Sequence, residues 1–287
     1  MINSTKIPTC KMKSSVVILT KNDNYGENLN HRAKMCINSL VENFDEVVIV
    51  DWKTRDRKTL LSNIIDQVPH VGKIKSIEVS NELLKEKYPH YYQWNILEAV
   101  GRNVGIRRAT GDWLASTNVD IVTTPIDFSK LSLNEFYTSS RRDIDENFHL
   151  GITDYQQLKN ILWENKDSYH DKPVVQNSTD IWSLVVCCGD FQIGARDVWM
   201  KTKGFEESIL YGCGIDSNVM KKASYHSDIK ILPYYLFHLN HGKGGERFDG
   251  EVTPPMSNQH AIIQDFDQTT NGENWGLADE ELIIETI

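Results

Sequence analysis

The hydrophobic pattern of the first 120 residues alternates between strand-like and helix-like segments. Runs of consecutive apolar or β-branched residues are typical of strands that are buried on both faces of a sheet. Such runs occupy 14–20, 46–52 and 112–117, and a weaker strand pattern occupies 72–80. Apolar residues recurring every three or four positions, as on one face of a helix, occupy 29–44, 57–68 and 94–111. Strands that alternate with helices predict an α/β fold with a mostly parallel sheet.

The second half of the chain has a less regular pattern. Strand and helix patterns return there, with strands expected at 183–195 and 228–242 and short helices at 196–205 and 214–224. Before them, residues 125–182 are polar and rich in charge clusters, with one expected helix at 154–166. Two interpretations stay open for this polar stretch: a lid or acceptor-binding insertion, or an ordinary surface excursion.

The composition narrows the classes of function. With 287 residues, 40% of them hydrophobic, the chain can bury a full core. A net charge of −9 and a pI near 5.5 argue against broad binding to nucleic acid or to a membrane surface. No apolar run approaches the roughly 18 residues that cross a bilayer, and the N-terminus lacks a signal-peptide pattern, so we expect a cytoplasmic protein without a transmembrane segment. The five cysteines lack C-x-x-C spacing, which favours reduced thiols.

Polar side chains follow three of the expected strands at their carboxyl ends, the edge where parallel α/β sheets bind ligands. Thr20–Asn22 follow the first strand, Asp51 ends the second, and Asn118–Asp120 follow the strand at 112–117. In an extended chain, Asn118 and Asp120 point the same way. A buried carboxylate needs hydrogen bonds, a counter-charge or a metal ion. A simple turn is the alternative for this segment, but it falls at the same edge.

Five motifs, in order, resemble the GT-A-fold glycosyltransferases, in particular their large inverting family-two group. VVILTKN and EVVIVDW are similar to its first two nucleotide-binding strands. GRNVGIRRATGDWLASTNVD resembles its Arg-Asn-x-Gly helix, which leads to a metal-binding Asp-x-Asp. GDFQIGARDVWMKTKGFEESILYGCGIDSNV is similar to the acceptor-side block, and FHLNHG resembles the histidine segment that closes the metal site in some members. The resemblance covers Ser15–Val122 and Val185–Gly242.

The resemblance implies one GT-A domain over residues 1–287, a Rossmann-like nucleotide-binding sheet flanked by helices with an acceptor-side subregion. Its expected parts are a nucleotide-binding half at 14–122, an insertion or lid at 123–184, an acceptor and metal-closing half at 185–242, and a C-terminal tail at 243–287.

The same resemblance implies a divalent metal ion held by the carboxylate of Asp120. His238 or His241 would complete the site, with His238 slightly preferred because it lies nearer the strand; two surface histidines flanking a turn are the alternative. Imidazole ligands favour Mn²⁺ over Mg²⁺, which prefers oxygen. The first aspartate of the motif is Asn118 here. Its amide oxygen can contact the ribose or the metal but supplies no charge, which predicts a weaker affinity for metal.

For the catalytic base, the resemblance points to Asp216. An inverting transfer needs a group that takes the proton from the acceptor hydroxyl. Asp216 is expected to open a helix, where the helix dipole keeps a carboxylate ionised. The competing interpretation is a purely structural helix N-cap. The family usually has an acidic pair at this point, whereas Ile215 precedes Asp216 here.

The residues expected to contact the nucleotide or the donor sugar are Thr20, Asn22, Asp51, Arg102, Asn103, Asn118 and Asp190. Asp51 would accept a hydrogen bond from N3–H of uracil, so a UDP-sugar is the favoured donor, and Lys21 is expected to be solvated. The predicted activity is metal-dependent transfer of the sugar to a glycan or another hydroxyl acceptor. The alternatives are a nucleotidyltransferase and a non-catalytic relative that binds nucleotide-sugars or glycans.

Overall fold

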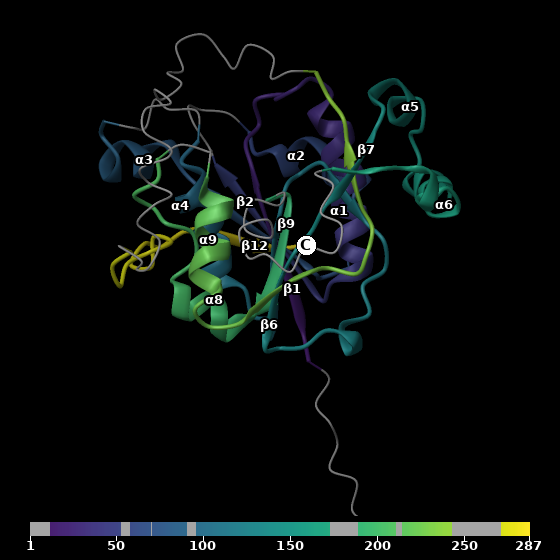
Figure 1. Cartoon of the computed structure of the whole chain (residues 1–287). Helices are drawn as coiled ribbons and strands as arrows, with labels where there is room; N and C mark the ends of the chain where they lie inside the picture. Colours follow the sequence, from purple (N-terminus) through teal and green to yellow (C-terminus); the bar gives the residue numbers. More distant parts are fainter. Residues whose placement is uncertain are drawn as a thin grey trace, which may run out of the picture.

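The computed structural model of the chain describes residues 12–52, 58–69, 71–90, 96–172, 189–210, 214–242 and 271–287. An eight-stranded sheet forms its centre (Figure 1). In spatial order, its strands are β10 (Asp228–Ile231), β6 (Glu135–Thr138), β9 (Phe191–Ala195), β4 (Trp113–Thr117), β1 (Ser14–Thr20), β2 (Glu46–Trp52), β3 (Ile74–Val79) and β12 (Ile283–Thr286).

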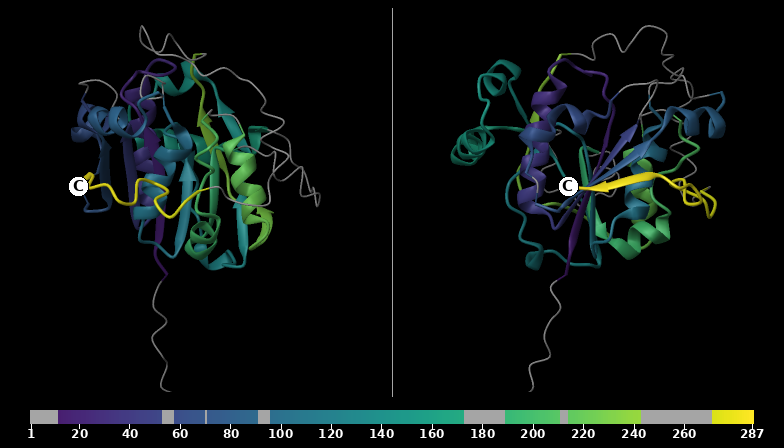
Figure 2. Two further views of the ribbon diagram at one scale, coloured as in Figure 1. Left: turned by 90° about the vertical axis from the view of Figure 1, so that its left-hand side faces the viewer. Right: turned by 180° about the vertical axis from the view of Figure 1, so that it is seen from behind.

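The middle of this sheet is parallel, as the sequence predicts. β1 pairs in parallel with β2 and β4, and β2 with β3, so Thr20 lies beside Asp51 at the carboxyl ends. β9 runs antiparallel between β4 and β6. The C-terminal strand β12, yellow in Figure 2, is antiparallel to β3. The predicted α/β class with a mostly parallel sheet is therefore confirmed.

Helices cover both faces of the sheet, and alternate strand residues face opposite layers. Val17 of β1 packs into the layer of α4 (Glu98–Arg108), α8 (Arg196–Thr202) and α9 (Ile215–Ala223). Val16 and Ile18 pack into the layer of α1 (Leu29–Asn43) and α2 (Leu60–Ile64). Figure 1 shows α4, α8 and α9 on one side of the sheet and α1 on the other. Two further short helices, η1 (Ile65–Gln67) and α3 (Asn81–Lys87), lie between β2 and β4 in the sequence.

A second, smaller sheet extends the first on the α1 side. Its strands, in spatial order, are β5 (Ile121–Thr123), β11 (Leu236–Leu239), β7 (Arg141–Ile144) and β8 (Asp171–Lys172). Around it lie η2 (Phe128–Lys130), α5 (Glu146–Leu150), α6 (Tyr155–Glu164) and η3 (Lys166–Ser168). The polar stretch 125–172 is therefore more than a surface excursion, because it contributes β6 to the large sheet and β7 to the small one.

Three expected elements differ from the structure. The strand expected at 183–195 begins at Phe191 as β9, after a turn at 189–190, and residues 183–188 lie outside the described residues. The single strand expected at 228–242 is divided into β10 and β11, which belong to different sheets. Pro233, which has no amide hydrogen for a ladder, lies at the break. Helix α4 begins at Glu98, and the expected start at 94 lies outside the described residues. None of the described helices has the length and apolar character needed to cross a membrane.

Candidate functional site

The carboxyl edge of the large sheet meets the small sheet just after β4. The amide of Asn118 donates to the carbonyl oxygen of Asp190 at the start of β9. Three residues later the chain enters β5, whose Ile121 lies opposite His238 of β11. The amide of Leu239 donates to the carbonyl of Asp120. The Asn-Val-Asp segment is thus a turn that joins the two sheets, and it brings Asp120 beside the end of β11.

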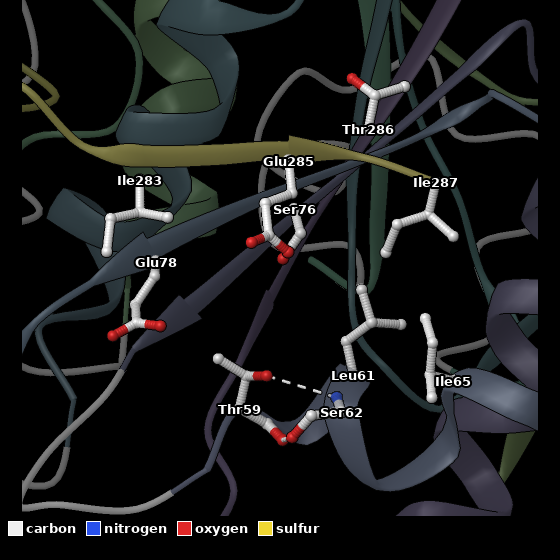
Figure 3. A pocket seen from close by; sticks show the side chains of 10 residues that line it. All are labelled: Thr59, Leu61, Ser62, Ile65, Ser76, Glu78, Ile283, Glu285, Thr286 and Ile287. Atoms are coloured by element: carbon white, nitrogen blue, oxygen red, sulfur yellow. Dashed lines mark hydrogen bonds between the residues drawn. The ribbon is translucent and has the colours of Figure 1, made fainter.

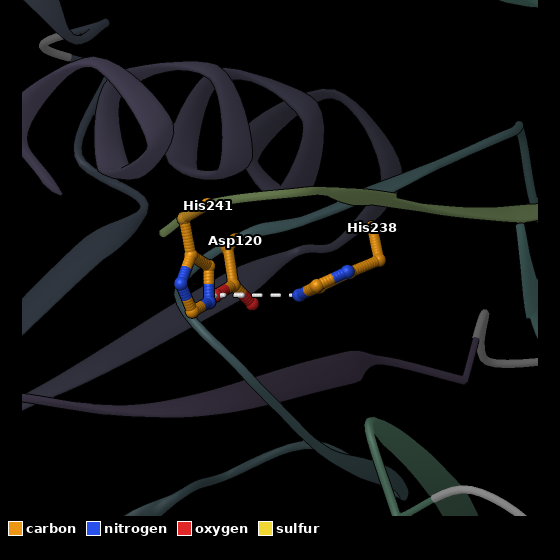
Figure 4. A group of neighbouring side chains, drawn as sticks. All are labelled: Asp120, His238 and His241. Atoms are coloured by element: carbon orange, nitrogen blue, oxygen red, sulfur yellow. Dashed lines mark ion pairs between the residues drawn. The ribbon is translucent and has the colours of Figure 1, made fainter. Parts of the chain in front are cut away.

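Asp120, His238 and His241 form one cluster at this junction (Figure 4). Oδ2 of Asp120 is 3.7 Å from Nε2 of His238 and 3.3 Å from Nε2 of His241. One ligand atom from each of the three side chains lies within 4.8 Å of the other two. Asp120 and His238 are buried, at 5% and 8% exposed. The structure therefore brings both histidines to Asp120, where the sequence favoured one of them.

The outer nitrogens of both rings face hydrogen-bond acceptors. Nδ1 of His238 lies 3.0 Å from Oδ1 of Asn240 and 3.3 Å from Oδ1 of Asp143. Nδ1 of His241 lies 2.9 Å from the carbonyl oxygen of Gly242. A neutral imidazole carries one N–H; where that N–H points to these outer acceptors, Nε2 keeps a lone pair. Nε2 of each ring faces the carboxylate of Asp120, which can accept an N–H or share a cation with such a lone pair.

Such a group of acceptors fits a divalent cation. Burial alone would raise the pKa of Asp120, but His241, His238 and the guanidinium of Arg32 together hold it below its usual value, so the carboxylate is ionised. Its Oδ1 atom is buried and has no hydrogen-bond partner among the described residues. One carboxylate and two imidazoles are suitable ligands for Mn²⁺ or a similar transition metal. Phosphate oxygens and water would complete the coordination.

The loop after β1 packs against the cluster. Tyr25 contacts the ring of His241 edge to face at 4.9 Å between centroids. Gly26 has φ 65°, and a Cβ there would lie 2.2 Å from Nδ1 of His241. The fully buried guanidinium of Arg32, on α1, donates to the carbonyl oxygens of Tyr25, Gly26 and Glu27. Sequence analysis missed Arg32, although an arginine next to the apolar stripe of an expected helix is a signal for a buried polar role.

Arg102 uses all five of its N–H groups, and three of them hold the end of β4 and the residue that follows it. Nε and Nη2 donate to Glu98, Nη1 donates to Oγ of Ser116 and the carbonyl of Thr117, and Nη2 also donates to Oδ1 of Asn118. An arginine has no further donor to offer a phosphate. In this conformation Arg102 therefore positions the turn that carries Asp120, and a direct contact with the nucleotide would need some of these bonds to break.

The amide of Asn118 is engaged at both ends. Its oxygen accepts from Arg102, and Nδ2 donates to Oδ1 of Asp190 at 2.5 Å. Nη1 of Arg141 donates to the other oxygen of Asp190 at 2.6 Å. An aspartate at position 118 would place its carboxylate against that of Asp190. The departure from Asp-x-Asp thus has a local reason: only an amide can accept from Arg102 and donate to Asp190.

Asp216 lies in the first turn of α9, near Arg102 and Glu98. The N-cap residue is Gly214, with φ 86°, so the competing interpretation of Asp216 as the N-cap is wrong. Burial raises the pKa of Asp216, and the charge of Glu98 acts in the same direction, while the amide of Ser217 and Arg102 oppose the shift. A Cβ at Gly189 would lie 2.3 Å from the Cβ of Asp216, so the chain before β9 needs a glycine to pass it.

Thr20, Asn22 and Asp51 lie together where β1 and β2 end. Asp51 is 1% exposed, and its Oδ2 accepts from the amide of Leu60 at 2.5 Å and from the hydroxyl of Thr20 at 3.3 Å. Its Oδ1 is buried without a hydrogen-bond partner in the described part of the chain. Asn22 donates to the carbonyl of Lys58 at 2.7 Å. These contacts tie the loop after β1 to the start of α2.

Two expectations for neighbouring residues are not supported. Lys21 is buried at 6% exposed, 4.0 Å from Asp23, rather than solvated. Asn103 is fully buried, and its amide exchanges hydrogen bonds with the backbone of Phe205 and donates to Glu207. Asn103 therefore fixes α4 to the turn after α8 and cannot reach a nucleotide from there. Of the cysteines, Cys36 is a buried free thiol, and the other four lie outside the described residues.

Asp51 gives a prediction for the pH dependence of stability. Burial raises its pKa from 3.8 to about 7, so the folded protein keeps this proton where the unfolded chain has lost it. The free energy of unfolding should therefore fall as the pH rises from about 4 to 7. Asp51→Asn should remove this loss and stabilise the protein at pH 8, by at most about 4 kcal/mol. Urea unfolding of both proteins at pH 5 and pH 8 measures the difference. Parallel changes in the two proteins would contradict the prediction.

A large cavity lies away from the cluster. It has a volume of about 630 Å³ and lies between α2 and the last two strands of the large sheet, β3 and β12 (Figure 3). Its walls combine carboxylates of Glu78 and Glu285 with hydroxyl groups and with apolar residues such as Leu61 and Ile283. None of the residues in the Asp120 cluster lines it. We therefore place the candidate site at the cluster and not in this cavity.

No protein-family model matches the sequence, and no curated protein matches it. Among solved structures, the crystal structure of GalNAc-T7 with UDP, GalNAc and Mn²⁺ gives a TM-score of 0.51 at 12% identity, over 85% of this chain and 45% of that protein. S. aureus TarS gives a TM-score of 0.49 at 14% identity, over 80% of this chain and 37% of TarS. This chain thus spans less than half the length of either protein. The architecture shared with GalNAc-T7 identifies the fold of this chain as the GT-A fold of glycosyltransferases.

Proposed function

We propose that the protein is a metal-dependent glycosyltransferase that moves a sugar from a UDP-sugar to a hydroxyl acceptor with inversion. The observation that carries this proposal is the convergence of Asp120, His238 and His241 at the carboxyl edge of a GT-A sheet. The crystal structure of GalNAc-T7, which has this fold, contains UDP and Mn²⁺. A bound divalent cation would neutralise the charge that develops on the diphosphate leaving group. The two imidazole ligands favour Mn²⁺ over Mg²⁺.

The nucleotide would bind beside Thr20, Asn22 and Asp51. The buried Oδ1 of Asp51 lacks a partner among the described residues, and N3–H of uracil would supply one. The raised pKa of Asp51 shows that its charge is poorly stabilised in the protein alone. A ligand N–H that donates to the carboxylate would stabilise this charge. Asn118 and Arg102 act indirectly in this proposal, since their bonds hold the turn that leads to Asp120.

Asp216 would remove the proton from the acceptor hydroxyl. A carboxylate with a raised pKa is a stronger base than an exposed one, and it stays mostly ionised as long as its pKa lies below the working pH. Asp190 is a weaker candidate, because Asn118 and Arg141 already donate to its two oxygens. A contact between Asp190 and a sugar hydroxyl stays a prediction.

The two alternatives differ in measurable ways. A nucleotidyltransferase needs basic groups for the triphosphate in the loop after β1, and the lysine of this loop is buried next to Asp23. A non-catalytic binder is favoured by the absence of a second carboxylate at Asn118. Slow hydrolysis of a UDP-sugar in the absence of an acceptor would identify an enzyme.

Calorimetry of UDP binding tests the proposal. We expect UDP to bind in the presence of Mn²⁺ and to lose most of its affinity after removal of the metal with EDTA. GDP should bind roughly 10- to 100-fold more weakly, the value of a hydrogen bond to a charged group of about 1.5–3 kcal/mol. Equal affinities for UDP and GDP would contradict the assignment of Asp51. Binding and turnover that survive exhaustive EDTA treatment would contradict the metal site.

A further inference from the structure

A second carboxylate lies behind the cluster, on the opposite side of the His238 ring from Asp120. Strands β7 and β11 run in parallel, with Asp143 directly beside His238. Adjacent residues in paired strands point to the same face of the sheet, so their side chains meet. Oδ1 of Asp143 lies 3.3 Å from Nδ1 of His238, while Nε2 of the same ring faces Asp120 at 3.7 Å. The imidazole therefore lies between two carboxylates.

Arg141 holds Asp143 in this position. Its Nε donates to Oδ1 of Asp143 at 2.9 Å, and its Nη1 donates to Asp190 at 2.6 Å. Asp190 in turn accepts from Asn118, which accepts from Arg102. This chain of bonds runs from Arg102 on α4 to Asp143 beside β11, with the neutral amide of Asn118 between Arg102 and Asp190. The side chain of Asp143 is 14% exposed and that of His238 is 10% exposed, so solvent screens their interaction only weakly.

The two carboxylates compete for the single N–H of the neutral imidazole. If the N–H points to Asp120, Nε2 has no lone pair and cannot bind a cation. If it points to Asp143 and Asn240, the lone pair of Nε2 faces Asp120 and any cation beside it. Carboxylates that accept the outer N–H of a metal-binding histidine fix the tautomer and the ring orientation in this way.

We propose that Asp143, held by Arg141, is a positioning residue that keeps the N–H of His238 on Nδ1 and aims Nε2 at the cation site. This inference rests on the metal-dependent function proposed above. The sequence presents the stretch around β7 only as a charge cluster. In this proposal, β7 supplies the residue that orients His238. This role also explains why an arginine and two aspartates, Asp143 and Asp190, meet at the junction of the two sheets.

Two measurements on the full chain test the inference. The first is the affinity for Mn²⁺ alone, by calorimetry, for wild type, Asp143→Ala and Asp143→Asn. Asp143→Ala should weaken Mn²⁺ binding about 10- to 100-fold, the usual effect of losing such a partner. Asp143→Asn should keep more of the affinity, because an amide oxygen still accepts from Nδ1–H. Asp167→Ala is the matched control, since Asp167 accepts from Tyr235 in the same region and is not a member of the cluster.

The second measurement is the tautomer of His238 by ¹⁵N NMR in the metal-free protein, at a pH about two units above the ordinary imidazole pKa of about 6.5. Wild type should show Nδ1–H, and Asp143→Ala should shift the population towards Nε2–H. The inference would be overturned if Asp143→Ala bound Mn²⁺ as tightly as Asp167→Ala does, or if the tautomer of His238 in Asp143→Ala were the same as in wild type. If wild type binds no Mn²⁺, the proposed function fails, and the tautomer comparison still decides whether Asp143 sets the state of the ring.

Discussion

Asp120→Ala is expected to abolish Mn²⁺-dependent binding of UDP and to lower sugar transfer by at least about 10³-fold. The change removes the one carboxylate of the described cluster and leaves two neutral imidazoles, which hold a hard divalent cation poorly. Loss of a cation that stabilises the leaving group removes several kcal/mol of transition-state stabilisation. Calorimetry with UDP and Mn²⁺ and an assay of initial rates measure the two effects.

The stability of the same variant separates this effect from unfolding. Asp120 is a buried, ionised group, and its Oδ1 has no hydrogen-bond partner among the residues that the structure describes. Because His241, His238 and Arg32 lower its pKa, the ionised carboxylate stabilises the folded state at neutral pH, and its removal should lower the melting temperature. A variant that is still folded at the assay temperature excludes unfolding as the cause of the lost binding. Asp127→Ala, which changes an exposed aspartate that caps η2, is a control for the general effect of losing a negative charge. A variant of Asp120 that keeps metal-dependent UDP binding would overturn the metal site.

Asp216→Asn should lower kcat by about 10²–10⁴-fold, the usual contribution of a positioned general base. The amide has the size of the carboxylate but cannot take a proton from the acceptor. The helix should still form, because its N-cap is Gly214 and not Asp216. Affinity for UDP should change little, since the role of Asp216 concerns the acceptor. Rates, calorimetry and thermal melting on one preparation give all three values.

The raised pKa of Asp216 adds an expected pH dependence to this test. Burial raises the pKa of this carboxyl, so kcat of the wild-type enzyme should fall on acidification at a pH above the ordinary value of 3.8. The same shift means that ionised Asp216 lowers the stability of the folded state once the pH exceeds its ordinary pKa. Asp216→Asn should therefore be at least as stable as wild type at neutral pH. Full activity of this variant would show that another group is the base.

The parallel core could be predicted from sequence because each strand is a local pattern. The patterns at 14–20 and 46–52 match β1 and β2 residue for residue, because the middle of each strand is an unbroken apolar run that is buried on both faces of the sheet. The smaller sheet could not be predicted in this way. β7 reads Arg-Arg-Asp-Ile, and its place beside β11 depends on a pairing between residues almost 100 positions apart.

The site shows the same division between local and long-range information. Asp120 and the histidines lie in short motifs after strands, and they were selected by the resemblance of these motifs to the metal site of GT-A glycosyltransferases. Asp143 gave no such signal, because its position beside His238 depends on which strand pairs with β7. Asn103 was a wrong choice that helix geometry could have excluded. Successive residues on a helix point about 100° apart, so Arg102 and Asn103 cannot both face the edge of the sheet.

The contact of Gly26 with His241 has a consequence for how donor and metal would be acquired. The loop after β1 carries Asn22, beside the expected nucleotide site, and the backbone of this loop lies against the imidazole of His241. Arg32 donates to three backbone carbonyls of this loop, so one loop borders both the expected nucleotide site and the cluster of Asp120 with its histidines. Sites coupled in this way obey thermodynamic reciprocity: the factor by which the cation tightens the nucleotide is the factor by which the nucleotide tightens the cation. With one carboxylate in place of two, the protein without nucleotide would then bind the cation weakly, and the cation would bind together with each donor molecule.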